Sequence, residues 1–208
     1  MNTADLLPFA RIMSDIYADD SKPTWTSLTK TVHVFVRQHP DGTTVIAHEG
    51  TTDWQEWLVD LLAAEIPFSQ DPELGPVHAG MAAEVETVAD EIASYVSNLP
   101  KYYLLGHSKG AGEALIQAGA QKKRGHPPSK VIAFEAPRIG TAQMRAYLAD
   151  TDIIQTITQN VHGKDVITQI PVGPTYVDMR EPVILMVPDS LDIAAKHRIA
   201  GVIAGLAA

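Results

Sequence analysis

The most constraining feature of the sequence is a serine, Ser108, that lies between two glycines, Gly106 and Gly110. An apolar run precedes it at 102–105, and a helix-like segment follows over 109–123. In a sharp turn from strand to helix, side chains beside the serine would clash, and glycine lacks the Cβ that causes the clash. Such a turn holds a serine hydroxyl above the edge of a sheet, beside a helix N-terminus. The pattern therefore predicts a strand–turn–helix unit that presents Ser108 as a nucleophile.

Composition limits the remaining choices. The 208 residues suit one domain, so we expect a single domain over 1–208, and a hydrophobic share of 45% is enough for a substantial core. The net charge of −9 argues against a nucleic-acid partner, and the absence of cysteine excludes disulfides and a thiol nucleophile. No run approaches the about 20 apolar residues of a transmembrane segment. The first residues lack a signal-peptide pattern, so we expect a cytoplasmic location, with release by lysis or non-Sec export as the alternative.

Hydrophobic periodicity and turn residues place the secondary structure. We expect a helix that begins near Thr3, a strand pair at 31–37 and 43–48, and a short helix over 53–65. From Ala79 onward helices and strands alternate, with helices at 79–98, 109–123, 141–149 and 191–205, and strands at 102–105, 130–135, 153–158, 175–179 and 183–187. This alternation predicts an α/β fold whose mainly parallel sheet has helices on both faces and an antiparallel N-terminal edge.

A nucleophilic serine needs a base to take its proton and an acid to orient that base. After a turn of this type the partners follow in the chain order serine, acid, histidine. Asp165 is the best acid because it follows a β-branched strand and the turn at Gly163. Three other aspartates are rivals that lie less clearly at a strand end: Asp150, Asp152 and Asp178.

His197 is the best base because it follows the last expected strand. His162 is the rival, but it precedes Asp165 too closely for the two to come from separate loops. The spacings H-x-x-x-H and H-E-x-x-H do not occur, so a histidine metal site is not expected.

The oxyanion of the reaction needs two donors. One candidate is the backbone N–H of Lys109, directly after the nucleophile. The other is Thr51, in the loop after the second strand, which offers both its N–H and its hydroxyl. A plain turn and helix cap is an equally good interpretation of Thr51.

Six separated segments carry further motifs in a fixed order: Glu49-Gly50-Thr51 followed by Trp57-Leu58-Val59-Asp60-Leu61, Val77-His78-Ala79-Gly80-Met81, Gly106-His107-Ser108-Lys109-Gly110, Phe134-Glu135-Ala136-Pro137-Arg138-Ile139-Gly140, Asn160 with Asp165, and His197. In this order they resemble R-G-T/S…W-x-x-D-L, V-H-x-G-F, G-H-S-L-G, F-G-x-P-R-V-G, an N-x-x-D loop that is two residues longer in this chain, and a late histidine. These are the motifs of the class 3 lipases, the fungal-lipase-like α/β-hydrolases.

The resemblance implies an α/β-hydrolase fold with Ser108 as nucleophile, Asp165 as acid and His197 as base. It also implies an oxyanion hole formed by Thr51 and Lys109. The implied activity is that of a serine carboxylic-ester hydrolase of the lipase or esterase type, working through an acyl-enzyme without metal or organic cofactor. Its substrate would be a small-molecule or lipid ester, phospholipids included, reached by transient contact with a lipid surface.

Some residues depart from the family pattern. Glu49 stands where arginine is usual, and Lys109 stands where leucine is common. Lys109 would either steer an anionic ester or form an exposed helical pair with Glu113 worth about 0.2–0.5 kcal/mol, and we favour the pair. An apolar helix face between 54 and 62 would either cover the site or, as we favour, pack on the sheet.

Two other functional classes share these features. An acyltransferase or a thioesterase would use the same three residues. A non-catalytic interaction module could be built on the same fold, because fold does not fix activity.

Overall fold

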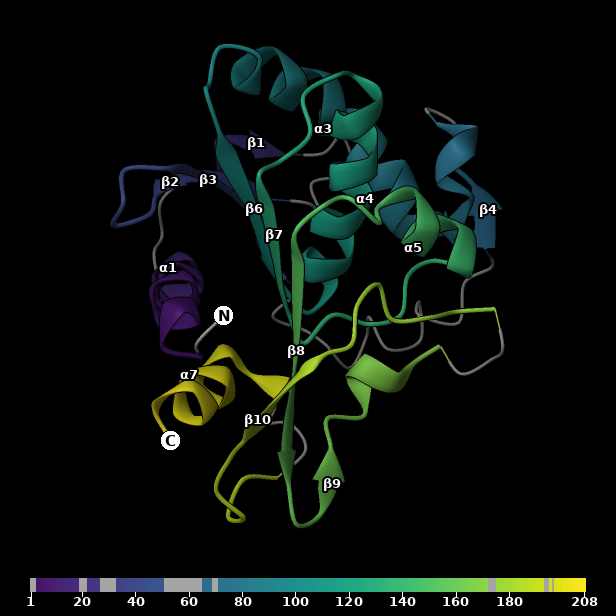
Figure 1. Ribbon diagram of the computed structural model, residues 1–208. Coiled ribbons are helices and arrows are strands. Elements are labelled where there is room, and N and C mark those ends of the chain that lie inside the picture. The colour runs from purple at the N-terminus through teal and green to yellow at the C-terminus, as the bar shows by residue number, and fades with distance from the viewer. Residues whose placement is uncertain are drawn as a thin grey trace.

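The computed structural model describes residues 3–18, 22–26, 33–50, 65–68, 71–171, 175–192, 195 and 197–208. Its centre is a sheet with the strand order β1-β2-β3-β6-β7-β8-β10, and β9 is added on β8 (Figure 1). The strands are β1 (Trp25–Thr26), β2 (His33–Gln38), β3 (Thr44–His48), β6 (Tyr102–His107), β7 (Lys130–Phe134), β8 (Ile153–Asn160), β9 (Gly163–Lys164) and β10 (Val183–Met186). A separate antiparallel pair is formed by β4 (Glu65–Pro67) and β5 (Pro76–His78).

The sheet has a parallel part and an antiparallel edge. Neighbouring strands from β3 through β6, β7 and β8 to β10 run parallel. At the N-terminal edge, β1, β2 and β3 pair antiparallel. The predicted mainly parallel sheet with an antiparallel N-terminal edge is therefore confirmed.

Helices cover both faces of this sheet, as predicted. The helices are α1 (Leu7–Ala18), α3 (Ala79–Val96), α4 (Lys109–Lys123), α5 (Ala142–Tyr147) and α7 (Ile199–Ala207), with 3-10 turns at Thr3–Leu6, Pro72–Leu74 and Ile167–Gln169. Helices α1 and α7 lie against one face, and α3, α4 and α5 against the other (Figure 1). In the part of the chain that the structure describes, no helix combines the length and the apolar character needed to cross a bilayer.

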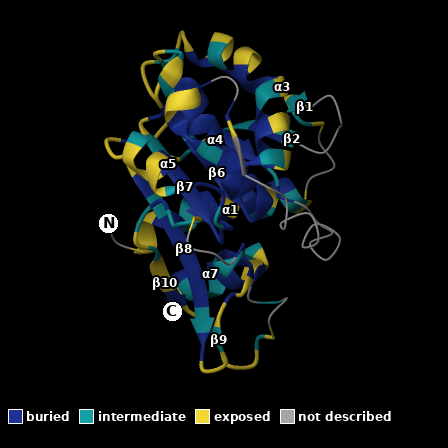
Figure 2. Ribbon diagram, turned by 90° about the vertical axis from the view of Figure 1, so that its right-hand side faces the viewer, coloured by how far each residue is buried: buried dark blue, intermediate teal, exposed yellow. Residues whose placement is uncertain are grey.

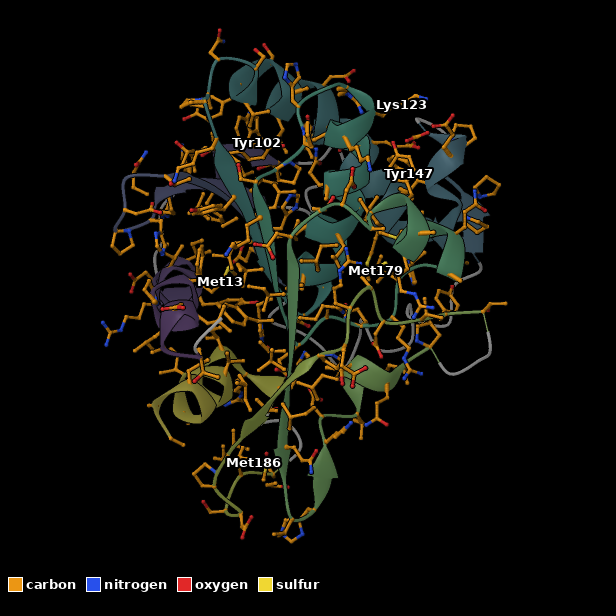
Figure 3. All side chains as sticks on the ribbon, viewed as in Figure 1. Met13, Tyr102, Lys123, Tyr147, Met179 and Met186 are labelled. Carbon is orange, nitrogen blue, oxygen red and sulfur yellow. The ribbon has the colours of Figure 1, made fainter. Side chains whose placement is uncertain are left out.

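Each face of the sheet supports its own apolar core. Because successive side chains of a strand point to opposite faces, Leu104 and Leu105 enter different cores. Met13 on α1 belongs to one core and Met179 to the other, on opposite sides of the sheet (Figure 3). Both faces of β6 and β7 are therefore buried, as Figure 2 shows, which explains their nearly continuous apolar runs. The parallel strands form a rigid platform under the turn at Ser108.

Two predicted elements near the C-terminus differ in the structure. The described residues Thr175–Met179 form an isolated bridge between Val177 and Gly140 rather than a strand, because β10 already pairs with β8 at this edge of the sheet. Of the helix expected over 191–205, Ala195 and His197 are helical, but the continuous helix α7 begins only at Ile199. The reason is local: Arg198 is extended, with ψ of 151°, and interrupts the helical conformation.

Some expectations fall outside the described residues. The structure describes nothing of 51–64, which includes Thr51, most of the expected helix at 53–65 and the apolar face between 54 and 62. Glu65, at the end of that expected helix, belongs to β4.

Candidate active site

Ser108 lies in a strained turn between β6 and α4. Its backbone has φ of 58° and ψ of −128°, a conformation that L-residues rarely adopt. A Cβ on Gly106 would overlap the carbonyl of Gly110, and a Cβ on Gly110 would overlap the carbonyl of His48. The Ser108 N–H still donates to the Phe134 carbonyl at 2.9 Å, so the sheet fixes the turn. The two glycines thus allow the close approach that the sequence pattern predicted.

The structure brings Ser108, His197 and Asp165 together in one hydrogen-bonded row. His197 Nε2 lies 2.7 Å from Ser108 Oγ, and His197 Nδ1 lies 2.5 Å from Asp165 Oδ2. A carboxylate only accepts, so Nδ1 carries the hydrogen and Nε2 is left to accept the serine proton. All three residues are buried. The row has the geometry of a nucleophile, a general base and an orienting acid.

Asp165 is held by the backbone around it. Its N–H donates to the Thr158 carbonyl at 2.9 Å, and its Oδ1 accepts from the Ile167 N–H at 3.0 Å. Burial alone would raise the pKa of Asp165, but the hydrogen bond and charge of His197 outweigh it and lower the pKa below its usual value. Asp165 is therefore a carboxylate facing the imidazole.

A second hydrogen-bonded chain holds His197 through its backbone. The carbonyl of His197 accepts from His107 Nε2 at 2.7 Å. That contact leaves His107 Nδ1 as an acceptor, and the Tyr17 hydroxyl donates to it at 2.8 Å. The Tyr17 oxygen in turn accepts from the Gly50 N–H at 3.1 Å. This chain connects α1, the loop after β3, the end of β6 and the segment that precedes α7.

Two members of this hydrogen-bonded chain have shifted pKa values. Burial, and secondly the nearby His197, lower the pKa of His107 to about 3, so this ring is neutral at physiological pH. Burial also raises the pKa of the Tyr17 phenol, which stays a donor. Sequence reasoning did not single out either residue. No local pattern pairs them, because Tyr17 and His107 are 90 residues apart in the chain.

The rival residues lie elsewhere. The rival aspartates each pair with a cation: Asp150 with Lys122 at 2.5 Å, Asp152 with Lys130 at 3.2 Å and Asp178 with Arg138 at 3.6 Å. His162 is exposed in the turn between β8 and β9. The positions of these side chains therefore favour Asp165 and His197 as the acid and the base.

Lys109 is the first residue of α4, so its backbone lies at the positive end of the helix dipole beside Ser108. Its ammonium lies 2.9 Å from Glu113, as expected for the pair, but Glu113 is fully buried rather than exposed. The reason is that α4 is enclosed between the sheet and α3. His48 Nδ1 lies 3.7 Å from the other Glu113 oxygen.

Glu135 is a residue of this site that sequence reasoning missed. It follows β7, and its ligand atoms lie within 4.8 Å of those of Asp165 and His197. Three such groups could in principle hold a metal ion, but both His197 ring nitrogens are already used by Ser108 and Asp165. The arrangement is better suited to moving a proton than to binding an ion. The sequence feature that could have identified Glu135 is its position, because the family motif has glycine there.

Solved lipase structures share this architecture. A lipase from Rhizopus microsporus var. chinensis superposes with a TM-score of 0.71 at 18% identity, covering 97% of this chain and 83% of that one. A mutant form of MDLA from Penicillium cyclopium superposes with a TM-score of 0.68 at 20% identity, covering 83% and 66%. These similarities show that the chain has the α/β-hydrolase fold.

Among curated proteins, the chain is similar to the secreted mono- and diacylglycerol lipase A of Penicillium cyclopium and of Penicillium camembertii. Each is 27% identical over 130 residues, which cover 59% of this chain and 42% of the relative. The matched region is thus less than half the length of these relatives. Their names contradict the expected cytoplasmic location, which was wrong because it rested only on the first residues of the sequence.

The class 3 lipase family is matched over residues 45–174. That range contains the serine turn, Glu135 and Asp165, and it makes up more than half of the chain. The chain belongs to the class 3 lipase family.

Proposed function

We propose that the chain is a serine carboxylic-ester hydrolase of the lipase type, with Ser108 as nucleophile, His197 as general base and Asp165 as the acid that orients it. The observation that carries this proposal is the buried row of contacts, 2.7 Å from Ser108 Oγ to His197 Nε2 and 2.5 Å from His197 Nδ1 to Asp165 Oδ2. The strained backbone at Ser108 supports it, since strain concentrates where function requires a fixed side chain.

The reaction follows from the direction of these hydrogen bonds. Ser108 Oγ attacks the ester carbonyl while its proton passes to His197 Nε2. The imidazolium that forms is stabilised by the Asp165 carboxylate, and it then protonates the departing alcohol. Water, activated by the same imidazole, cleaves the acyl-enzyme and releases the carboxylic acid.

The oxyanion formed in both steps needs donors that are fixed in advance. We assign this role to the backbone N–H of Lys109, at the N-terminus of α4, and to Thr51, which lies outside the described residues. The hydrogen bond from the Gly50 N–H to Tyr17 supports the second assignment, because it anchors the residue that precedes Thr51.

The proposed substrate class is a carboxylic ester of a lipid. The names of the Penicillium relatives make mono- and diacylglycerols the first esters to test, in an extracellular setting. Phospholipids are a second class of lipid ester that the enzyme could hydrolyse. Paired assays with neutral and phosphate-bearing esters of equal acyl length would separate the two groups.

The decisive experiment uses a fluorophosphonate probe and p-nitrophenyl esters. Ser108→Ala should abolish labelling and lower kcat by about 10⁶-fold. Asp165→Asn should lower kcat by about 10⁴-fold, and both variants should stay folded. Ser94→Ala, which changes an exposed serine on α3, is the matched control and should match the wild type. A Ser108→Ala variant that still labels and turns over esters would refute the assignment.

The same assay separates the alternatives. A thioester substrate or an added alcohol acceptor that is consumed faster than an ester is hydrolysed would indicate a thioesterase or an acyltransferase. A folded wild-type protein that neither labels nor hydrolyses any ester would indicate a non-catalytic module.

A further inference from the structure

Glu135 occupies a backbone position that does not suit a glutamate. It follows β7 with φ of 52°, in the left-handed region that favours glycine. The family motif quoted above has glycine at this point. A side chain kept where the backbone disfavours it needs a compensating role, and the surroundings of the carboxyl group show what that role could be.

The Glu135 carboxyl is completely buried and is fixed by β8. Thr158 donates to it through its backbone N–H, 3.1 Å from both oxygens, and through its hydroxyl at 3.2 Å. The Thr156 hydroxyl contacts Oε1 at 3.3 Å. These contacts hold the carboxyl beside Asp165, on the side of the strand ends where His197 also lies.

Two buried carboxyl groups so close together cannot both be ionised without a large cost. The ionised form is more favourable for Asp165 than for Glu135, because Asp165 faces His197 and accepts a hydrogen bond from the Ile167 N–H. Burial, followed by the charge of Asp165 and the hydrogen bond to it, raises the pKa of Glu135 well above its usual value. Of the two groups, Glu135 is therefore the one that favours the protonated, neutral form.

We infer that Glu135 is a positioning residue whose neutral carboxylic acid donates a hydrogen bond to Asp165 and holds that carboxylate on His197. The row of side chains thus has four members: Ser108, His197, Asp165 and Glu135. This inference rests on the proposed function, because positioning Asp165 matters only if the row is catalytic. Among the residues that the structure describes, Asp165 and His197 are the titratable groups that face Glu135, and His107 lies behind His197 with ring centres 5.4 Å apart.

Two variants separate positioning from a merely structural role. Glu135→Gly removes the carboxyl and relieves the backbone strain, so the protein should fold. Its kcat should fall at least about tenfold with little change in KM, because Asp165 loses one of the contacts that hold its carboxylate on His197. Glu135→Gln keeps an uncharged donor and should retain most of kcat. Glu91→Gln, on the exposed face of α3, is the matched control for a changed carboxyl.

The pH–rate profile is the readout that a structural role would not move. In Glu135→Gln the acid limb should stay within about 0.3 unit of the wild type, because one neutral group replaces another. If Glu135 were ionised, removing its charge so near His197 would move that limb by about one unit or more. Such a displacement, or wild-type kcat in Glu135→Gly, would overturn the inference.

Infrared difference spectra test the same point without catalysis. The wild type minus Glu135→Gln spectrum at pH 7 should contain the carbonyl stretch of a protonated carboxylic acid, and its absence would overturn the inference. Failure of the proposed function is distinguishable, since it would appear as wild-type protein that neither labels at Ser108 nor hydrolyses esters, whatever the infrared band shows.

Discussion

Removing one oxygen atom, in Tyr17→Phe, tests the hydrogen-bonded chain that supports His197. The Tyr17 hydroxyl donates to His107 Nδ1 at 2.8 Å and accepts from the Gly50 N–H at 3.1 Å. Phenylalanine fills almost the same space, so the change removes these two hydrogen bonds and little packing. Both partners then lose a hydrogen bond, and both are buried, so water does not readily replace the hydroxyl.

The expected loss can be worked out from these two groups. An unsatisfied buried donor or acceptor costs about 1–3 kcal/mol, so two of them should lower the free energy of unfolding by about 2–6 kcal/mol. For a domain of this size each kcal/mol shifts the melting temperature by about 2–4 °C, which gives a decrease of about 4–24 °C.

Thermal unfolding followed by circular dichroism measures this directly, with urea unfolding as a second measure of the free energy. Tyr103→Phe is the matched control, because its hydroxyl donates to the exposed Asp41 at 3.1 Å. It should change stability by no more than about 0.5 kcal/mol. A Tyr17→Phe protein that melts within about 1 °C of the wild type would refute the reasoning that this chain supports the site.

Two further predictions concern buried ionisable groups. The pKa of His107 is about 3 in the folded protein, against an ordinary histidine value of 6.5, so the unfolded chain binds the extra proton between these values. Stability should therefore fall as pH drops from about 6.5 towards 3, by up to about 1.4 kcal/mol per pH unit, and His107→Gln should flatten this slope in urea titrations whereas exposed His162→Gln should not. Lys109→Leu should lower the free energy of unfolding by about 3 kcal/mol, because it leaves the buried Glu113 without its ammonium partner at 2.9 Å. The double variant Lys109→Leu with Glu113→Leu should recover much of that loss, and a stable single variant would contradict the buried pair.

The sequence predicted the fold well where the hydrophobic residues follow a single helical or strand periodicity. The helix at 109–123 has the predicted bounds, and the long helix differs from its prediction only at the C-terminal end. The strand before the serine turn, β6, and the strand after α4, β7, were also found, because apolar runs bounded by glycine or proline have few other solutions. Near 175–179 the same reasoning was wrong, since pairing depends on a free sheet edge and β10 already occupies it.

The sequence also predicted some features of the candidate site and misjudged others. Chain order and strand ends were enough to choose Ser108, Asp165 and His197, and the structure places their side chains in contact. The exposure of the Lys109–Glu113 pair was misjudged, because helical spacing gives the separation of two residues along a helix but not what covers them.

What the sequence by itself determined is the α/β order of elements, the strained serine turn and the three residues proposed to act there, because each depends on neighbours along the chain or on strand order. Only the tertiary structure decided which groups surround them. The neutral state of His107, the anchoring role of Tyr17 and the carboxyl pair of Glu135 and Asp165 depend on burial and on contacts between distant segments. Such energies arise when folding removes water from polar groups, and no local pattern records which groups will meet there.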